Sequence, residues 1–294
     1  MPITKPSTIG ILPRSLQQVL AEVVNKIVSA VQPEKIICYG LRSVHYQDWG
    51  CFLDEGVIRD TYRLKLDLLI IAPVTKGQLE QDISFAAEQQ CKPLADVHCI
   101  THKIHSVNEN LTKGNPFFCA LYNKGLLIYD AGQTALDTPG LSVGTSLERN
   151  ILEVIWSRWY GLAQHFYKSA VDSQDFERPD LTAFMLHQAM EHTCGALIRI
   201  FTGYRPNTHN LSRLLMMVEN FTDQFTRIFP KGTKQEEDLY SVLQHGYLDA
   251  RYKDEYIVPI GILDILIQRV QEAQAVAAIL YQEKLSLYSL PKVG

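Results

Sequence analysis

The spacing of apolar residues changes near the middle of this chain, and that change limits the folds open to it. Before about residue 130, short apolar runs such as Leu64–Ile71 alternate with helical segments and turns, as in a sheet covered by helices. After residue 147, apolar residues recur every three or four positions over long segments. We therefore predict an α+β protein of two domains, the first with a mixed sheet and the second an up-down helical bundle.

A segment rich in Gly, Thr and Ser, around residues 130–146, separates the two halves. We place the first domain at residues 1–135, a linker at 136–146 and the helical domain at 147–294. The total of 294 residues suits two domains of ordinary size.

Local patterns predict the individual elements. In the first half we expect strands at 35–40, 64–71, 95–101 and 126–129, and helices at 16–31, 78–90 and 115–123. The polar segment 41–63 has no clean period. In the second half we expect helices at 151–168, 180–201, 211–229, 233–251 and 259–281. Gly203 is expected to end the second of these helices, and Thr233 with Glu236 has the spacing of a capping box.

Composition excludes several functional classes. Lys plus Arg number 28 against 32 Asp plus Glu, a formal charge of −4, so contact with nucleic acid would have to be local. Residues 1–10 lack a signal-peptide pattern, and polar residues interrupt the apolar stretch 260–280, so we expect no membrane association. The six cysteines form no Cys-x-x-Cys pair, which favours thiols in a reducing cytoplasm.

Three segments on or directly after the expected strands of the first half follow a recognisable order. They are Tyr39-Gly40-Leu41-Arg42-Ser43, then Lys65-Leu66-Asp67, then Asp96. Over residues 13–130 this order resembles the nucleotidyltransferase superfamily of the minimal and kanamycin-modifying type. The resemblance implies a Gly-Ser loop that holds a triphosphate, an Asp-x-Asp strand and a third acid on the next strand. In that family the three carboxylates hold two magnesium ions.

Two positions depart from that pattern. Leu41 stands where the family has serine, and Lys65 stands where it has the first acid; Asp67 and Asp96 match the other two acids. An ammonium in place of a carboxylate makes an attractive interaction with a metal repulsive, by on the order of a few kcal/mol. We therefore expect no bound metal, and a salt bridge from Lys65 to Asp67 or Asp96 in its place. Asp60 is the one alternative acid.

The candidate site residues of this half follow from the same comparison. Asp67 and Asp96 are the candidate catalytic residues, with magnesium as a cofactor only if the transferase is active. Gly40, Arg42, Ser43 and Lys65 are candidates for holding the phosphates of a nucleoside triphosphate without metal. The spacing of His98, His102 and His105 also suggests a metal site, although no acid or cysteine completes a tetrahedral set, and surface or half-buried histidines are the favoured interpretation.

Three short motifs of the second half resemble the HEPN domain, over about residues 147–285. They are Gln188-Ala189-Met190-Glu191, Thr208-His209-Asn210-Leu211 and Ala250-Arg251-Tyr252. Many HEPN domains are ribonucleases with an Arg-x4–6-His motif, but no histidine follows Arg251 in that range. Arg158 and His165 have the spacing, on a different helix. The resemblance to non-ribonuclease members implies nucleotide binding and dimerisation, with Arg205, His209 and Arg251 as phosphate contacts; for His209 and Arg251, backbone bonding or ion pairing is the alternative.

Three functions remain open from the sequence. The first is a homodimeric protein that binds a nucleotide or an RNA or other nucleic-acid end through a degenerate transferase site. The second is an active nucleotidyltransferase that adds a nucleoside monophosphate to a small molecule, an RNA end or a partner protein. The third is a structural dimerisation scaffold or antitoxin-like partner.

Overall fold

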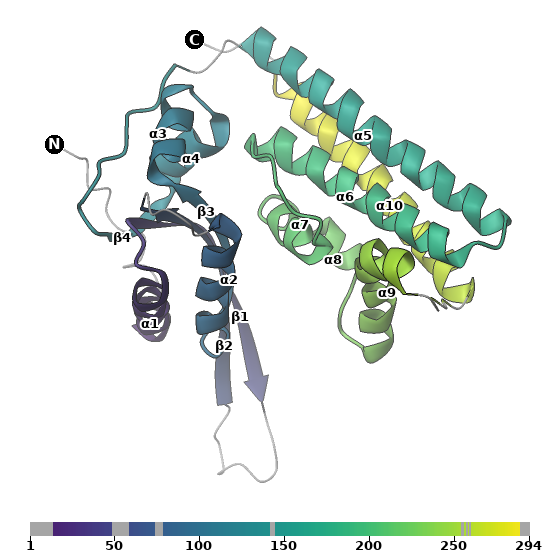
Figure 1. Cartoon of the computed structure of the whole chain (residues 1–294), viewed down its shortest axis with the longest axis horizontal. Helices are drawn as coiled ribbons and strands as arrows, with labels where there is room; N and C mark the ends of the chain where they lie inside the picture. Colours follow the sequence, from purple (N-terminus) through teal and green to yellow (C-terminus); the bar gives the residue numbers. More distant parts are fainter. Residues whose placement is uncertain are drawn as a thin grey trace. The chain divides into compact units, whose positions relative to one another are not determined.

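The computed structural model describes residues 14–48, 59–73, 79–141, 145–253, 256, 258 and 260–288. The chain divides into two compact units, Met1–Ser142 and Val143–Gly294 (Figure 1). We call them the α/β unit and the helical unit. None of the described helices is both long and apolar enough to span a membrane.

The α/β unit contains one mixed sheet with the strand order β3-β2-β1-β4. Strand β1 is antiparallel to β2 and to β4, whereas β2 and β3 are parallel, which confirms the predicted mixed sheet. The elements are α1 (Arg14–Val31), β1 (Lys35–Asp48), β2 (Arg59–Ala72), α2 (Glu80–Cys91), β3 (Asp96–Lys103), α3 (Ile104–Thr112), α4 (Pro116–Lys124) and β4 (Leu126–Asp130).

The two faces of this sheet have different roles because strand side chains alternate. Leu64, Leu66, Leu68 and Ile70 of β2 are buried in one core with apolar residues of α1 and α2, which lie together against the sheet in Figure 1. The other face of β2 presents Lys65 and Asp67 first and the buried Leu69 and Ile71 further along. The polar part of the sheet therefore lies on the face opposite α1 and α2.

Strands β1 and β2 are much longer than the sequence predicts. We expected strands at 35–40 and 64–71 with an aperiodic segment between them, but β1 continues to Asp48 and β2 already begins at Arg59. The described pairing of β4 with β1 ends at Cys38, and the described pairing of β3 with β2 begins at Lys65. The outer parts of β1 and β2 therefore pair only with each other. A ribbon of this kind is held by backbone hydrogen bonds and requires no continuous apolar face, so it leaves no period in the sequence.

The helical unit is built around α6, whose residues are among the most buried of the chain. Gly203 at φ 76° ends α6 in the left-handed conformation, and the capping box of Thr233 and Glu236 begins α9, both as predicted. The elements are α5 (Thr145–Asp175), α6 (Pro179–Thr202), α7 (Leu211–Val218), α8 (Gln224–Ile228), α9 (Lys234–Tyr252) and α10 (Ile260–Ser286).

Two helix predictions were wrong. The single helix expected over 211–229 is two, α7 and α8, because the hydroxyl of Thr222 accepts a bond from the Gln224 N–H and competes with the helical pattern. His105 lies outside every helix expected from the sequence, but the structure places it on α3. Pro259, expected in the first turn of the last helix, lies outside the described residues.

Candidate functional site

Asp67 lies at the centre of the polar face of the sheet. The strand register places it between Gly40 of β1 and His98 of β3. Its side chain is only 1 % exposed, and its Oδ2 accepts a hydrogen bond from Nη2 of Arg42 at 2.9 Å. Its Oδ1 lies 3.4 Å from Nδ1 of His98. Basic side chains therefore flank both carboxylate oxygens.

Lys65 and Asp96 complete this cluster. Lys65 lies two residues before Asp67 on the same face of β2, and the register pairs it with Arg42 on one side and Asp96 on the other. We call Arg42, Lys65, Asp67, Asp96 and His98 the Asp67 cluster. The structure thus brings four of the residues singled out in the sequence to one place.

His98 was not assigned to this group from the sequence. It is 4 % exposed and borders Asp67, although the sequence suggested only a metal ligand or a surface residue. The signal that could have found it is its position two residues after Asp96, on the same face of the same strand.

Gly40 and Ser43 do not form the phosphate-binding loop that the resemblance implies. Residues 40–43 continue β1 and pair with β2. Successive N–H groups of an extended strand point in opposite directions, so they cannot converge on one anion as they do in a loop. The register also places Ser43 opposite Leu64, on the face away from Arg42. Residues 40–43 are therefore strand, with a register shift between Cys38 and Gly40, and the role of Gly40 and Ser43 in phosphate binding stays a prediction.

The Asp67 cluster does not fit a pair of magnesium ions. Magnesium needs several oxygen ligands, whereas both oxygens of Asp67 face basic side chains, and Lys65 stands where the resemblance implies the first acid. Asp60 is no replacement, since seven residues along an extended strand separate it from Asp67 by about 23 Å. Among the described residues, no group of three or more His, Cys, Asp or Glu is arranged to hold a metal ion.

The three histidines of the spacing motif have separate surroundings. His98 lies at Asp67, whereas Nδ1 of His102 lies 3.4 Å from a carboxylate oxygen of Glu80 and its ring contacts Phe118. Burial lowers the pKa of His102, and the nearby Glu80 opposes that effect. His105 is exposed on α3.

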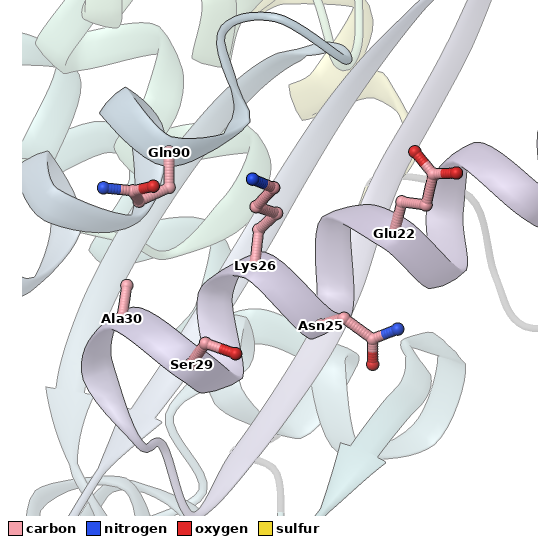
Figure 2. A pocket seen from close by; sticks show the side chains of 6 residues that line it. All are labelled: Glu22, Asn25, Lys26, Ser29, Ala30 and Gln90. Atoms are coloured by element: carbon pink, nitrogen blue, oxygen red, sulfur yellow. The ribbon is translucent and has the colours of Figure 1, made fainter.

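A hollow of about 550 Å³ lies elsewhere on the α/β unit, along α1. Figure 2 shows five of its lining residues on α1 and Gln90 on α2, with side chains that point in different directions. Since these polar groups do not converge, as ligand sites require, we do not regard the hollow as the functional site.

The three motifs of the helical unit meet around Glu191 of α6. The carboxylate of Glu191 accepts from Nδ1 of His209 at 2.9 and 3.0 Å, and one of its oxygens lies 3.6 Å from Nε2 of His187. Burial alone would raise the pKa of Glu191, but the hydrogen bonds from His187 and His209 outweigh it, and the pKa is lowered. The ring of His187 also contacts the carbonyl oxygens of Leu243 at 3.0 Å and His209 at 3.1 Å.

Tyr247 of α9 connects this group to Arg251. The ring of His209 stacks on Tyr247 at 4.8 Å, and the guanidinium carbon of Arg251 lies 4.0 Å from the centre of the same ring. Nε of Arg251 donates to the carbonyl of Tyr247 at 2.8 Å, and Asp249 pairs with Lys253. We call His187, Glu191, His209, Tyr247 and Arg251 the Glu191 cluster.

The described contact of Arg205, the third expected phosphate contact, is with a residue outside the Glu191 cluster. Its guanidinium carbon is 5.9 Å from the ring centre of Trp159 on α5. His165, seven residues after Arg158 on the same helix, places Nδ1 2.8 Å from the carbonyl of Gly161. Arg158 and His165, the pair with ribonuclease-like spacing, therefore lie on one helix, and the histidine contacts the backbone of that same helix.

Comparison with protein families matches residues 156–285 to the HEPN domain. The match begins in α5 and ends in α10, so the helical unit contains a HEPN domain, as the three motifs predicted. Comparison with curated proteins gives no match. The α/β unit has a mixed sheet and is not assigned to a family, so its resemblance to nucleotidyltransferases stays a prediction.

Proposed function

We propose that the chain binds a nucleotide or a nucleic-acid end, and that its α/β unit is a nucleotidyltransferase-like domain that has lost metal-dependent transfer. The observation that supports this most is the environment of Asp67. Its carboxylate is buried, bonds to the guanidinium of Arg42 and lies beside the ring of His98, so both of its oxygens face protein side chains.

Arg42 and Lys65 are the proposed phosphate contacts of the α/β unit. A guanidinium has five N–H donors and an ammonium three, so one phosphate can bridge both side chains while Arg42 keeps its bond to Asp67. Three acids without cations would repel a phosphate unless metal ions were present. In this chain the cations Arg42 and Lys65 lie beside the acids Asp67 and Asp96, so phosphate binding does not require metal ions.

Titration calorimetry of the whole chain with nucleoside triphosphates, with and without magnesium, tests this function. We expect binding that does not need magnesium, weakened about tenfold or more in Lys65→Gln, because a charge-assisted contact contributes about 1.5–3 kcal/mol. Lys124→Gln is the matched control: it removes the same charge from an exposed position on α4 of the same unit, and affinity should not change.

Two other outcomes would replace the proposal. Magnesium-dependent release of pyrophosphate that is lost in Asp67→Asn would establish an active transferase. The observation that favours this alternative is the parallel pairing of β2 and β3, which brings Asp67 and Asp96 to adjacent strands. No binding of any nucleotide would favour the structural scaffold.

We also propose a homodimer in the cytoplasm. The dimer is supported by the HEPN match and what the resemblance implies, and the compartment by the described cysteines, none of which forms a disulfide. Light scattering should give twice the chain mass of 33.4 kDa, and a mass of one chain would contradict the dimer.

A further inference from the structure

The ring of His187 joins three segments inside the helical unit. His187 lies on α6 and is 1 % exposed. Its Nδ1 lies 3.0 Å from the carbonyl oxygen of Leu243 on α9. Its Nε2 lies 3.1 Å from the carbonyl oxygen of His209, in the segment 203–210 between α6 and α7. One buried side chain therefore connects α6 both to α9 and to this segment.

Both nitrogens of this ring face acceptors, and that decides its charge. A carbonyl oxygen accepts hydrogen bonds and cannot donate them. A neutral imidazole has one N–H group, so one of its nitrogens would direct a lone pair at a neighbouring carbonyl oxygen. An imidazolium has two N–H groups and donates to both carbonyls. Since a buried polar group without a partner is costly, the two contacts favour the doubly protonated ring.

Glu191 supplies the negative charge that a buried cation needs. It lies one turn further along α6 than His187, and its Oε2 is 3.6 Å from Nε2 of that ring. Burial alone would raise the pKa of Glu191, yet hydrogen bonds from His187 and His209 lower it, so the carboxylate beside the ring is ionised. The rings of His187 and His209 therefore share one carboxylate.

The other side chains around the ring of His187 add no second acid. Tyr247 of α9 contacts it with ring centres 5.4 Å apart, and the guanidinium carbon of Arg251 lies 4.0 Å from the centre of the Tyr247 ring. Burial raises the pKa of the Cys194 thiol on α6, so this group stays uncharged. In the described contacts of the ring, helices α5, α7 and α10 contribute no titratable group. Glu191 is thus the acid that compensates this ring.

We propose that His187 is a buried imidazolium whose second proton acts as a pH-sensitive lock on the segment 203–210. The carbonyl of Leu243 is also fixed by its place inside α9, whereas the segment has no regular secondary structure. Loss of a proton as the pH rises therefore releases the His209 carbonyl and loosens the segment, while α9 stays in place. Histidine is the side chain that ordinarily changes charge between pH 5 and 8. The lock goes beyond the proposed function, because it holds whether or not the chain binds a nucleotide.

Two measurements on the whole chain at pH 6 and pH 9 test the lock. With histidine ring nitrogens labelled with 15N, the NMR signals of His187 are those absent from His187→Gln. At pH 6 we expect both of its nitrogens to carry a proton, and at pH 9 only one. Hydrogen exchange of peptides covering 203–210, corrected for the intrinsic effect of pH, should become about tenfold faster or more at pH 9, because a buried bond to a charged group is lost.

His187→Gln keeps one donor group and cannot gain a proton, so the segment should exchange quickly at both pH values. His245→Gln is the matched control: His245 is exposed on α9 and its Nδ1 contacts the carbonyl of Ser241 in its own helix, so the pH effect should remain.

Three results would overturn the lock. They are a His187 ring with one proton at pH 6, equal corrected exchange of the native chain at pH 6 and pH 9, and an equal pH effect in His187→Gln and the native chain. The last result would assign the effect to His209, which bonds to the same carboxylate. The exchange measurement on the native chain needs no variant, so the test stands even where His187→Gln does not fold.

Discussion

A buried carboxylate is stable only with its partners, as the surroundings of Asp67 show. A charge taken out of water costs several kcal/mol unless nearby cations and hydrogen bonds compensate it. Arg42 of β1 provides that compensation through a 2.9 Å bond, and His98 of β3 lies 3.4 Å from the other oxygen. The cluster therefore contributes to the stability of the sheet as well as to any ligand site.

Asp67→Asn should destabilise the α/β unit by about 2–3 kcal/mol, less than for a fully buried pair because Arg42 is 30 % exposed. The change leaves Arg42 beside a neutral amide. Hydrogen exchange of peptides from β2 and β3 would show faster exchange in the variant. Glu109→Gln, at an exposed ion pair of α3, should leave the same peptides unchanged. Equal protection of β2 in Asp67→Asn and the native chain would show that the ion pair is not needed.

Glu191 should make the stability of the helical unit depend on pH. Its pKa is lowered from an ordinary value of 4.5, so its ionised form stabilises the folded state above that pH, and the contribution is lost as the pH falls through the lower folded-state pKa. We expect Glu191→Gln to be less stable than the native chain near neutral pH and the difference to shrink below about pH 4. Urea unfolding followed by tryptophan fluorescence at several pH values measures it, and a constant difference would contradict the role of Glu191.

Helices α6 and α9 are held together by a close approach at Gly246. A Cβ added there would lie 2.6 Å from the carbonyl oxygen of Ala183, which is backbone and cannot move aside cheaply. The crossing therefore requires glycine, and it sets the position of Tyr247 and Arg251 on the following turn of α9.

Gly246→Ala should destabilise the helical unit by about 1–3 kcal/mol, because the helices must separate. Gly161→Ala on α5 is the matched control, since nothing lies within 4 Å of its added Cβ and alanine favours a helix by about 0.5–1 kcal/mol. Thermal unfolding by circular dichroism should thus shift in opposite directions for the two variants. Equal shifts would mean that α6 and α9 do not touch at this point.

The sequence predicted those elements in which a buried face imposes a period. It predicted β2 from Leu64 onward, α6 and the capped start of α9 for this reason. The outer ribbon of β1 and β2 and the break between α7 and α8 depend on backbone pairing and on one hydroxyl, which leave no apolar pattern. At the site, the acids were visible as motifs, but the partners of Asp67 were not, because they are set by strand register across β1, β2 and β3.

At the scale of the whole molecule, the chain consists of two compact units, each with buried apolar residues of its own. A core of its own is what allows a domain to fold alone.

The fragment 143–294 should fold by itself and unfold in one cooperative transition, because its helices bury their apolar faces against α6. Circular dichroism of this fragment, compared with the fragment 1–142, tests it. A helical fragment that unfolds gradually, without a sharp midpoint, would show that the helical unit depends on the rest of the chain.

The aromatic rings between α5 and α10 provide an optical signal for such experiments. The indole of Trp156 is stacked on Tyr160 of the same helix, with ring centres 4.0 Å apart, and on Tyr281 of α10, with ring centres 4.2 Å apart. Both tyrosine rings are nearly parallel to the indole. Rings held in a fixed asymmetric stack give strong near-ultraviolet dichroism that vanishes when they rotate freely. The departure of α10 from α5 can thus be followed spectroscopically in the native protein, without any attached dye.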